Sequence, residues 1–153
     1  MDVYLLRHAK AVDYTPTDHE RSLSGKGLRQ SDACGLWLAS QGVSFDLAIV
    51  SDAQRTRETW QGLKLECPVN VTSEAYQASA PALERLIQQS GDAQSVLLIA
   101  HNPGISDLAR QAGYEHDLKT CQLVHLKLDG HSGDFWAELA HVVDIYRPTV
   151  DAR

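Results

Sequence analysis

Three short apolar runs, each continuous rather than alternating with polar residues, narrow the folds open to this chain more than any other feature. They lie at residues 3–6, 46–50 and 95–100. A strand that is covered on both faces has no polar side to present, so its apolar side chains follow one another without a break. Such strands belong to parallel sheets with helices on both faces. The pattern predicts an α/β fold with residues 3–6 as a central strand.

Amphipathic segments alternate with these runs and are predicted to be helices. The expected helices cover residues 25–40, 53–63, 81–89 and 105–112, and a further strand is expected at 68–72. Ser24 is placed to cap the first helix, and either Ser51 or Asp52 the second. Gly42 and Gly113 are placed to end the first and fourth helices in a left-handed conformation.

The last third of the chain has a different pattern. Residues 121–128 and 135–143 alternate apolar and polar side chains and are joined by a glycine-rich segment at 129–133, which is typical of an antiparallel hairpin. Four strand-helix units followed by a hairpin predict a three-layer sandwich with a mixed, mainly parallel central sheet. At 153 residues, the chain is expected to be a single domain over 1–153.

Composition and charge exclude several classes of function. The formal net charge is -6, so neither nucleic acid nor an anionic membrane surface is an expected partner. The three cysteines Cys34, Cys67 and Cys121 lack the spacing of a disulfide framework or zinc site, and no apolar stretch is long enough to span a membrane. Without a signal-peptide pattern at residues 1–10, a cytoplasmic location is expected.

Basic side chains follow the predicted parallel strands where each strand ends. Arg7 and His8 follow the first strand, Arg55 lies one helical turn beyond the second, and His101 follows residues 95–100. Ligands of open parallel sheets bind beyond the carboxyl ends of the strands. Each residue alone could be structural, as a surface cation or a hydrogen-bonded ring, but the four recur at one edge. We therefore expect them to meet in one pocket.

The chemistry of this set points to a phosphoryl group. Guanidinium groups bind phosphate oxygens in pairs, and helix N-termini add amide donors. A neutral imidazole is a competent nucleophile at phosphorus, with no metal ion or other cofactor required. Glycine-loop, cysteine-loop and zinc motifs are missing from the sequence, and Gly25, Lys26 and Gly27 lack phosphate-loop spacing.

Three segments that carry these residues resemble the histidine phosphatase superfamily, which has the phosphoglycerate-mutase-like fold. The segments are LRHA at 6–9, SDAQRTRET at 51–59 and AHNPG at 100–104. The short length, together with RHA, ERSLSGKG at 20–27 and HNPG, resembles the SixA-type phosphohistidine phosphatases. The match extends in order and spacing from residue 3 to about residue 112.

This resemblance implies roles for individual residues. His8 would be the phosphorylated nucleophile, Arg7 and Arg55 would clamp the phosphoryl group, His101 would contact it, and Arg21 would line the pocket. The family's commonest form has glycine after the nucleophilic histidine, whereas this chain has alanine at position 9. Alanine at this position is common among the SixA-like members.

The proton donor is the main departure from the family pattern. Many members have an acidic residue after the third strand, and Glu74 is the candidate here, although a solvated surface role is as plausible. A phosphorylated imidazole can leave without a strong acid, whereas an alkoxide needs a proton. The expected substrate is therefore phosphohistidine in a protein, for example a histidine-containing phosphotransfer domain, with inorganic phosphate as the product in the pocket. A small-molecule phosphomonoesterase and an inactive phosphate-binding module remain the alternatives.

Overall fold

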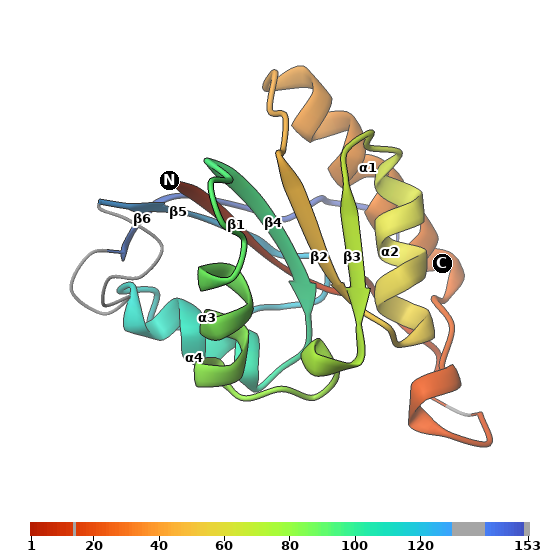
Figure 1. The fold of residues 1–153 in the computed structure, drawn as a ribbon. Coiled ribbons are helices and arrows are strands. Elements are labelled where there is room, and N and C mark those ends of the chain that lie inside the picture. The colour runs from red at the N-terminus through yellow and green to blue at the C-terminus, as the bar shows by residue number, and fades with distance from the viewer. Residues whose placement is uncertain (14, 130–139, 152–153) are drawn as a thin grey trace.

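The computed structural model describes residues 1–13, 15–129 and 140–151 (Figure 1). Within these residues, six strands form one sheet in the order β3-β2-β4-β1-β5-β6. The strands are β1 (Asp2–Arg7), β2 (Leu47–Ser51), β3 (Val69–Thr72), β4 (Ser95–Ala100), β5 (Leu123–Leu128) and β6 (Ala140–Tyr146). The first four are parallel, and β5 is antiparallel to both β1 and β6. The predicted mixed, mainly parallel sheet is confirmed, with β1 and β4 at its centre.

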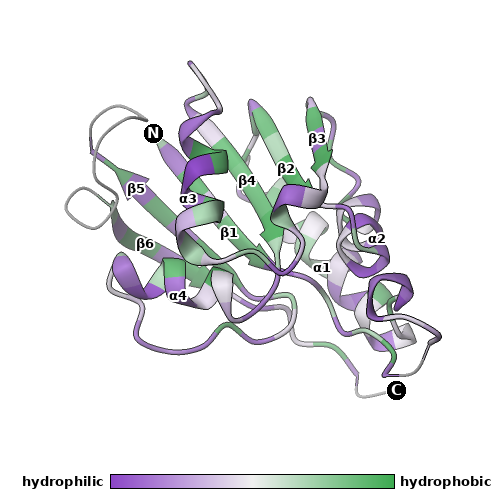
Figure 2. Cartoon of the chain, turned by 60° about the horizontal axis from the view of Figure 1, so that its bottom comes forward, coloured by the Kyte–Doolittle hydropathy of each residue, from purple (hydrophilic) through white to green (hydrophobic). Residues whose placement is uncertain are grey.

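Helices cover both faces of the sheet, as predicted. Figure 1 shows α3 and α4 on one face and α1 and α2 on the other. The helices are α1 (Gly25–Ser40), α2 (Gln54–Leu63), α3 (Ala80–Gln88) and α4 (Gly104–Gln111), and two short 3-10 turns are η1 (Asp18–Glu20) and η2 (Ser73–Ala75). Figure 2 shows the strands as the most hydrophobic part of the chain and the connecting segments beyond their ends as mostly hydrophilic.

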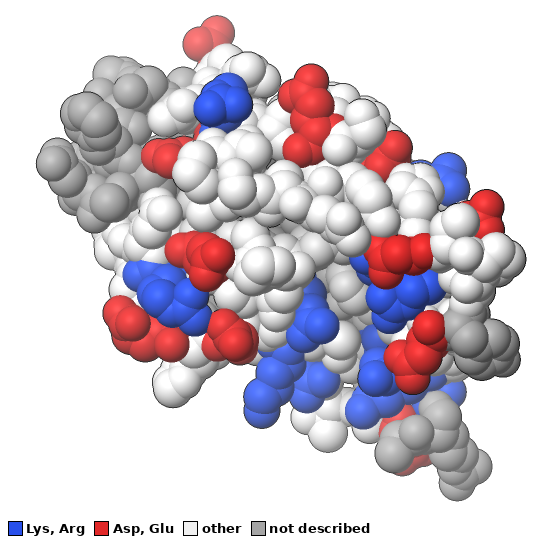
Figure 3. Space-filling view, turned by 90° about the horizontal axis from the view of Figure 1, so that it is seen from below, with Lys and Arg blue, Asp and Glu red and all other residues white. Residues whose placement is uncertain are grey.

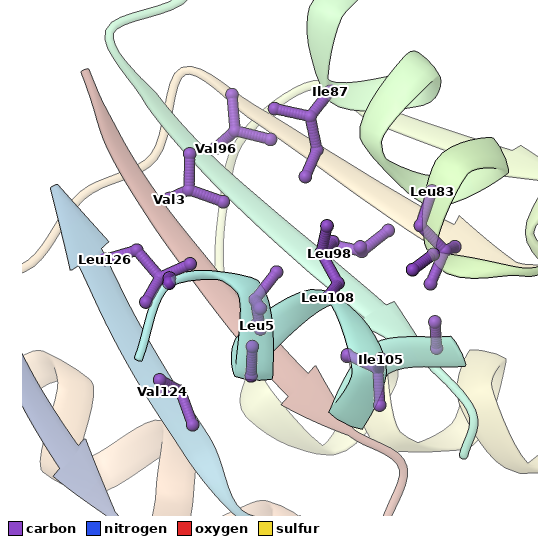
Figure 4. Close-up of a cluster of buried hydrophobic side chains, with 14 of the residues drawn as sticks. Val3, Leu5, Leu83, Ile87, Val96, Leu98, Ile105, Leu108, Val124 and Leu126 are labelled. Carbon is purple, nitrogen blue, oxygen red and sulfur yellow. The ribbon is translucent and has the colours of Figure 1, made fainter. Parts of the chain in front are cut away.

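Successive residues of the central strands supply two separate cores. Val3 and Leu5 of β1 pack beneath α3 and α4, in the cluster drawn in Figure 4. Tyr4 and Leu6 belong to the cluster on the opposite face, with residues of α1 and α2. Each fully buried Leu or Ile side chain stabilises the fold by about 1.5–3 kcal/mol. The two cores hold β1 and β4 rigidly, and so fix where these strands end.

Local signals at the helix ends are confirmed at α1 and corrected at α2. The Ser24 hydroxyl accepts a hydrogen bond from the Gly27 amide, and Gly42 has a φ of 67° directly after the helix. Helix α2 begins at Gln54, with Ala53 rather than Ser51 or Asp52 at the cap position. Ser51 is instead the last residue of β2, where its buried hydroxyl has another partner.

The antiparallel pairing of the C-terminal strands is confirmed, but the predicted end of the last strand is wrong. Residues 130–133 of the expected connection at 129–133, and residues 135–139 of the expected strand, lie outside the described residues. Strand β6 extends to Tyr146, three residues beyond the predicted end. The Tyr146 ring stacks on Trp37 of α1 with ring centroids 4.0 Å apart, which joins the end of β6 to this helix.

In residues 1–13, 15–129 and 140–151, no helix is both long enough and apolar enough to cross a bilayer.

Candidate active site

The register of β1 against β4 brings two histidines together at the carboxyl edge of the sheet. Arg7 pairs with Ala100, and the His8 amide donates to the Ala100 carbonyl at 3.2 Å, which extends the ladder by one residue. His101 follows on β4. The ring centroids of His8 and His101 are consequently 5.3 Å apart, with 54° between the ring planes.

The His8 ring is held in the orientation that a nucleophile needs. Its Nδ1 lies 2.7 Å from the Ala9 carbonyl oxygen, and because a carbonyl only accepts, Nδ1 carries the proton. The lone pair is then on Nε2, for which the described residues offer no hydrogen-bond partner. Burial, and then the charges of Arg55, Arg7 and Arg21, lower the pKa of His8 to about 4, so the ring is neutral at pH 7.

His101 is also buried and neutral at pH 7. Its Nε2 lies 2.8 Å from the Ser51 hydroxyl at the end of β2, which joins a third strand to the site. Burial, followed by the proximity of His8 and Arg55, lowers the pKa of His101 to about 3. If Ser51 donates its hydroxyl proton to Nε2, the proton of the neutral ring is on Nδ1, which has no partner in the described chain.

The two arginines lie beside this histidine pair. Arg55, in the first turn of α2, is 4% exposed and donates to the backbone oxygen of Asp18 at 2.8 Å and to its carboxylate at 3.0 Å. Arg7 donates to the Leu118 carbonyl at 3.0 Å. Burial lowers the pKa of Arg7, and the cation of Arg147 lowers it further. Both guanidinium groups therefore keep donor capacity beyond these bonds.

Three buried side-chain nitrogens in the described part of the chain have no hydrogen-bond partner, and all three belong to this site. They are Arg7 Nε, Arg55 Nε and His101 Nδ1. An unpaired buried donor costs about 1–3 kcal/mol, so such groups call for an explanation. A tetrahedral oxyanion offers several acceptor oxygens at once and would satisfy all three. The site is therefore suited to an anion next to His8 Nε2.

The backbone around His8 is fixed from both sides. The Ala9 amide donates to the Thr59 hydroxyl of α2 at 3.0 Å, and this hydroxyl donates to the Arg55 carbonyl at 2.7 Å. On the other side, the Cys121 amide bonds to the carbonyls of Arg7 and His8. The nucleophile candidate therefore cannot move independently of α2 and the segment before β5.

Asp18 is a site residue that the sequence did not reveal. Its carboxylate accepts hydrogen bonds from Arg55, Arg21, the Tyr76 hydroxyl at 2.6 Å and the Gln77 amide. The Tyr76 bond, and then those from Arg21 and Arg55, hold the pKa of Asp18 well below its usual range. Asp18 therefore joins η1 to the segment after β3 and stays ionised. Its only sequence signal is its place three residues before Arg21.

The structure brings Arg21 to the rim of the site but leaves Glu74 elsewhere. Arg21 bonds to Asp18 and to the Val12 carbonyl, and its charge contributes to the low pKa of His8. The exposed Glu74 side chain lines a separate cavity against α3. Glu74, the expected proton donor and substrate contact, therefore does not join the site. The turn of η2 directs Tyr76 toward the site instead, with its ring centroid 5.6 Å from that of His101.

No group of three or more His, Cys, Asp or Glu side chains suited to a metal ion is present in the described ranges. The donors at this site are nitrogens of arginine and neutral histidine.

Comparison with known proteins identifies the family of this chain. Residues 3–76 match the family model of the histidine phosphatase superfamily, branch 1. A protein of Mycobacterium leprae is 31% identical over 111 residues, covering 68% of this chain and 68% of its own. The chain belongs to the histidine phosphatase superfamily.

Solved structures of this superfamily share nearly the whole fold. The Nakamurella multipartitia protein assigned as the phosphohistidine phosphatase SixA is 25% identical, with a TM-score of 0.87, and the alignment covers 97% of this chain and 96% of that one. The protein histidine phosphatase SixA complexed with tungstate is 20% identical, with a TM-score of 0.82, covering 96% and 97% of the two chains. Superfamily membership and these neighbours support a phosphatase.

Proposed function

We propose that this protein hydrolyses phosphohistidine in a partner protein through a phosphoryl intermediate on His8. The observation that carries the proposal is the group of three unpaired buried nitrogens, from Arg7, Arg55 and His101, around the free Nε2 of a neutral histidine. The superfamily match, and a SixA relative that forms a complex with the oxyanion tungstate, support the proposal of an oxyanion site.

The proposed reaction has two displacements at phosphorus. The lone pair of His8 Nε2 forms a bond to phosphorus, and the bond from phosphorus to the substrate's imidazole nitrogen breaks, with its electron pair returning to that ring. A water oxygen then bonds to phosphorus and gives its proton to solvent, while the bond from phosphorus to Nε2 breaks. The arginines hold the equatorial oxygens in both steps.

The charge state of Asp18 favours phosphohistidine over a phosphate ester. Ester cleavage expels an alkoxide, which needs a protonated acid nearby. Asp18 is held ionised by Tyr76 and the arginines, and Glu74 lies in another cavity. A phosphorylated imidazole whose other nitrogen carries a proton leaves as a neutral ring, and so needs no acid from the enzyme.

The test compares substrates and follows the label. The protein is incubated with a phosphotransfer domain labelled on its histidine and, separately, with p-nitrophenyl phosphate, and acid-labile label on the enzyme is trapped by rapid denaturation. We expect faster turnover of the phosphohistidine domain and label on the wild type but not on His8→Ala. His116→Ala, at an exposed histidine elsewhere, is the matched control and should behave as the wild type.

Each other outcome contradicts a defined part of the proposal. A large preference for p-nitrophenyl phosphate would indicate a phosphomonoesterase. Phosphate binding without turnover or label would indicate an inactive binding module. Full activity of His8→Ala would refute the covalent mechanism.

A further inference from the structure

Four cations surround the segment that connects the active site to the C-terminal part of the chain. We call them the basic rim: Lys10 after β1, Lys26 in the first turn of α1, Lys119 before β5 and Arg147 after β6. Figure 3, which views the molecule from below, shows Lys and Arg side chains gathered over this end, where the parallel strands terminate. The rim is thus assembled from four separate segments.

Hydrogen bonds through Gln30 and Thr120 hold these segments together. The Gln30 side chain accepts from the Lys10 amide at 2.9 Å and donates to the Thr120 hydroxyl at 3.3 Å. Arg147 donates to the Thr120 carbonyl at 2.9 Å and to its hydroxyl at 3.1 Å. Lys26 and Arg147 also line one open groove of about 260 Å³, with Gln30 and residues 148–150. The rim is one fixed surface.

This surface is continuous with the active site. Cys121, the residue after Thr120, donates its amide proton to the Arg7 and His8 carbonyls. Arg147 lies close enough to Arg7 for its charge to lower the pKa of that guanidinium. A molecule with its phosphoryl group at His8 would therefore extend over the rim.

The charges of the rim lack compensation within the described residues. None of the three lysine ammonium groups has an ion-pair partner there, and Arg147 bonds only to uncharged Thr120. Some cations outside the rim are paired, for example Arg110 with Asp107 and Asp117, whereas Arg57 bonds to the Gln54 side chain. Gathering unpaired cations costs free energy through their repulsion, although the chain carries a formal net charge of -6. Such a patch is expected where a complementary anionic surface binds.

We infer that the basic rim docks acidic side chains on the phosphorylated protein substrate, beside its phosphohistidine. This inference rests on the proposed function. The rim lysines are exposed or half-buried, and Lys26 lies with Arg147 in an open groove. A site for a small phosphorylated molecule instead encloses its ligand and has buried polar groups. Exposed cations suit the edge of a protein interface, where they accelerate association and select partners by charge.

The test reverses charge on the rim and compares a protein substrate with a small one. The double variant carries Lys26→Glu and Lys119→Glu. Its kcat/KM for a phosphorylated phosphotransfer domain with an acidic surface should fall at least tenfold. Its kcat/KM for phosphoimidazole, a small phosphoramidate, should stay within twofold of the wild type. The decline of the protein reaction with added salt should also become shallower, because fewer charge pairs form across the interface.

A control variant changes the same net charge at other places. Lys64→Glu with Lys127→Glu alters exposed lysines of the α2 end and of β5, and should keep both reactions near wild-type rates. An equal loss with both substrates, no loss with either, or the same loss in the control would overturn the inference. A loss confined to small bisphosphorylated compounds would assign the rim to a small molecule instead. If the wild type hydrolyses phosphoimidazole or the phosphorylated domain no better than p-nitrophenyl phosphate, the result refutes the proposed function. It does not refute the docking role of the basic rim.

Discussion

The two active-site histidines should remain uncharged far below neutral pH, because charging either ring requires a proton inside a buried site that already contains arginines. His8 is 7% exposed and His101 4%, and neither ring contacts a carboxylate. To test this, the pH of the substrate-free protein is lowered from 7 to 5. Both rings should still be neutral at the lower pH.

The size of the effect follows from the pKa of His8. A drop from 6.5 to about 4 corresponds to a cost of about 3 kcal/mol for charging the ring in the folded protein. At pH 5, a ring with this pKa is about nine-tenths neutral, whereas an ordinary histidine is only about 3% neutral. A nucleophile that needs its lone pair therefore retains most of its competence at pH 5.

Proton-nitrogen NMR of histidine-labelled protein measures the protonation state of each ring directly, because the ring nitrogen shifts report its charge. In the substrate-free protein, no ionisation of a substrate complicates the titration. Signals are assigned with His8→Asn and His101→Asn. Replacing Arg55 by Met should raise the pKa of both rings, since the nearby cation opposes their protonation. A titration midpoint near 6 for His8 in the wild type would refute the argument from burial.

The same shift has a consequence for stability. In the window between pH 6.5 and about 4, the unfolded chain binds a proton at His8 that the folded chain does not. Stability therefore rises with pH through this window and is lost as the pH falls, by up to about 3 kcal/mol for His8. His101 contributes with the same sign. Urea unfolding of wild type and His8→Asn at pH 7 and pH 4.5 measures the difference.

Three further predictions test the framework of the site. Gly104→Ala would place its Cβ against the Ala78 carbonyl oxygen and should destabilise the fold by about 2 kcal/mol in thermal unfolding, whereas Gly25→Ala, with only a flexible side chain nearby, should change it by less than about 0.5 kcal/mol. Asp18→Asn should lower the free energy of unfolding at pH 7 by about 1 kcal/mol, because this partly exposed carboxylate loses charged hydrogen bonds. The difference between wild type and variant should shrink as the pH falls below 4. A difference that stays constant with pH would contradict the low pKa of Asp18. Ser51→Ala removes the hydroxyl that orients its histidine partner and should reduce kcat/KM about tenfold, with unchanged far-ultraviolet circular dichroism.

The convergence of the active-site residues was predictable because it depends on only two facts. Continuous apolar runs identify strands buried on both faces, and the carboxyl ends of parallel strands share one edge of a sheet. His8, His101 and Arg55 follow such ends, so their meeting required no knowledge of the loops. The antiparallel pairing at the C-terminal end was likewise evident from alternation alone.

Contacts between loops could not be predicted in this way. Asp18 and Tyr76 are separated by 57 intervening residues, and their hydrogen bond depends on the paths of two irregular segments. The same limit explains the error over Glu74, since a rotation of η2 decides which of its neighbours faces the site. The local sequence does not predict that rotation.

Ser51 illustrates the difference between what the sequence determines and what only the tertiary structure decides. By itself the sequence determined the sheet, its helical layers and the edge where the chemistry gathers, because burial patterns are properties of each segment. Only the tertiary structure decided that the Ser51 hydroxyl would hold His101 rather than cap α2, that Asp18 would bind the arginines, and that four distant cations would form one rim. These outcomes depend on distances between segments, which the fold sets after the strands are in place.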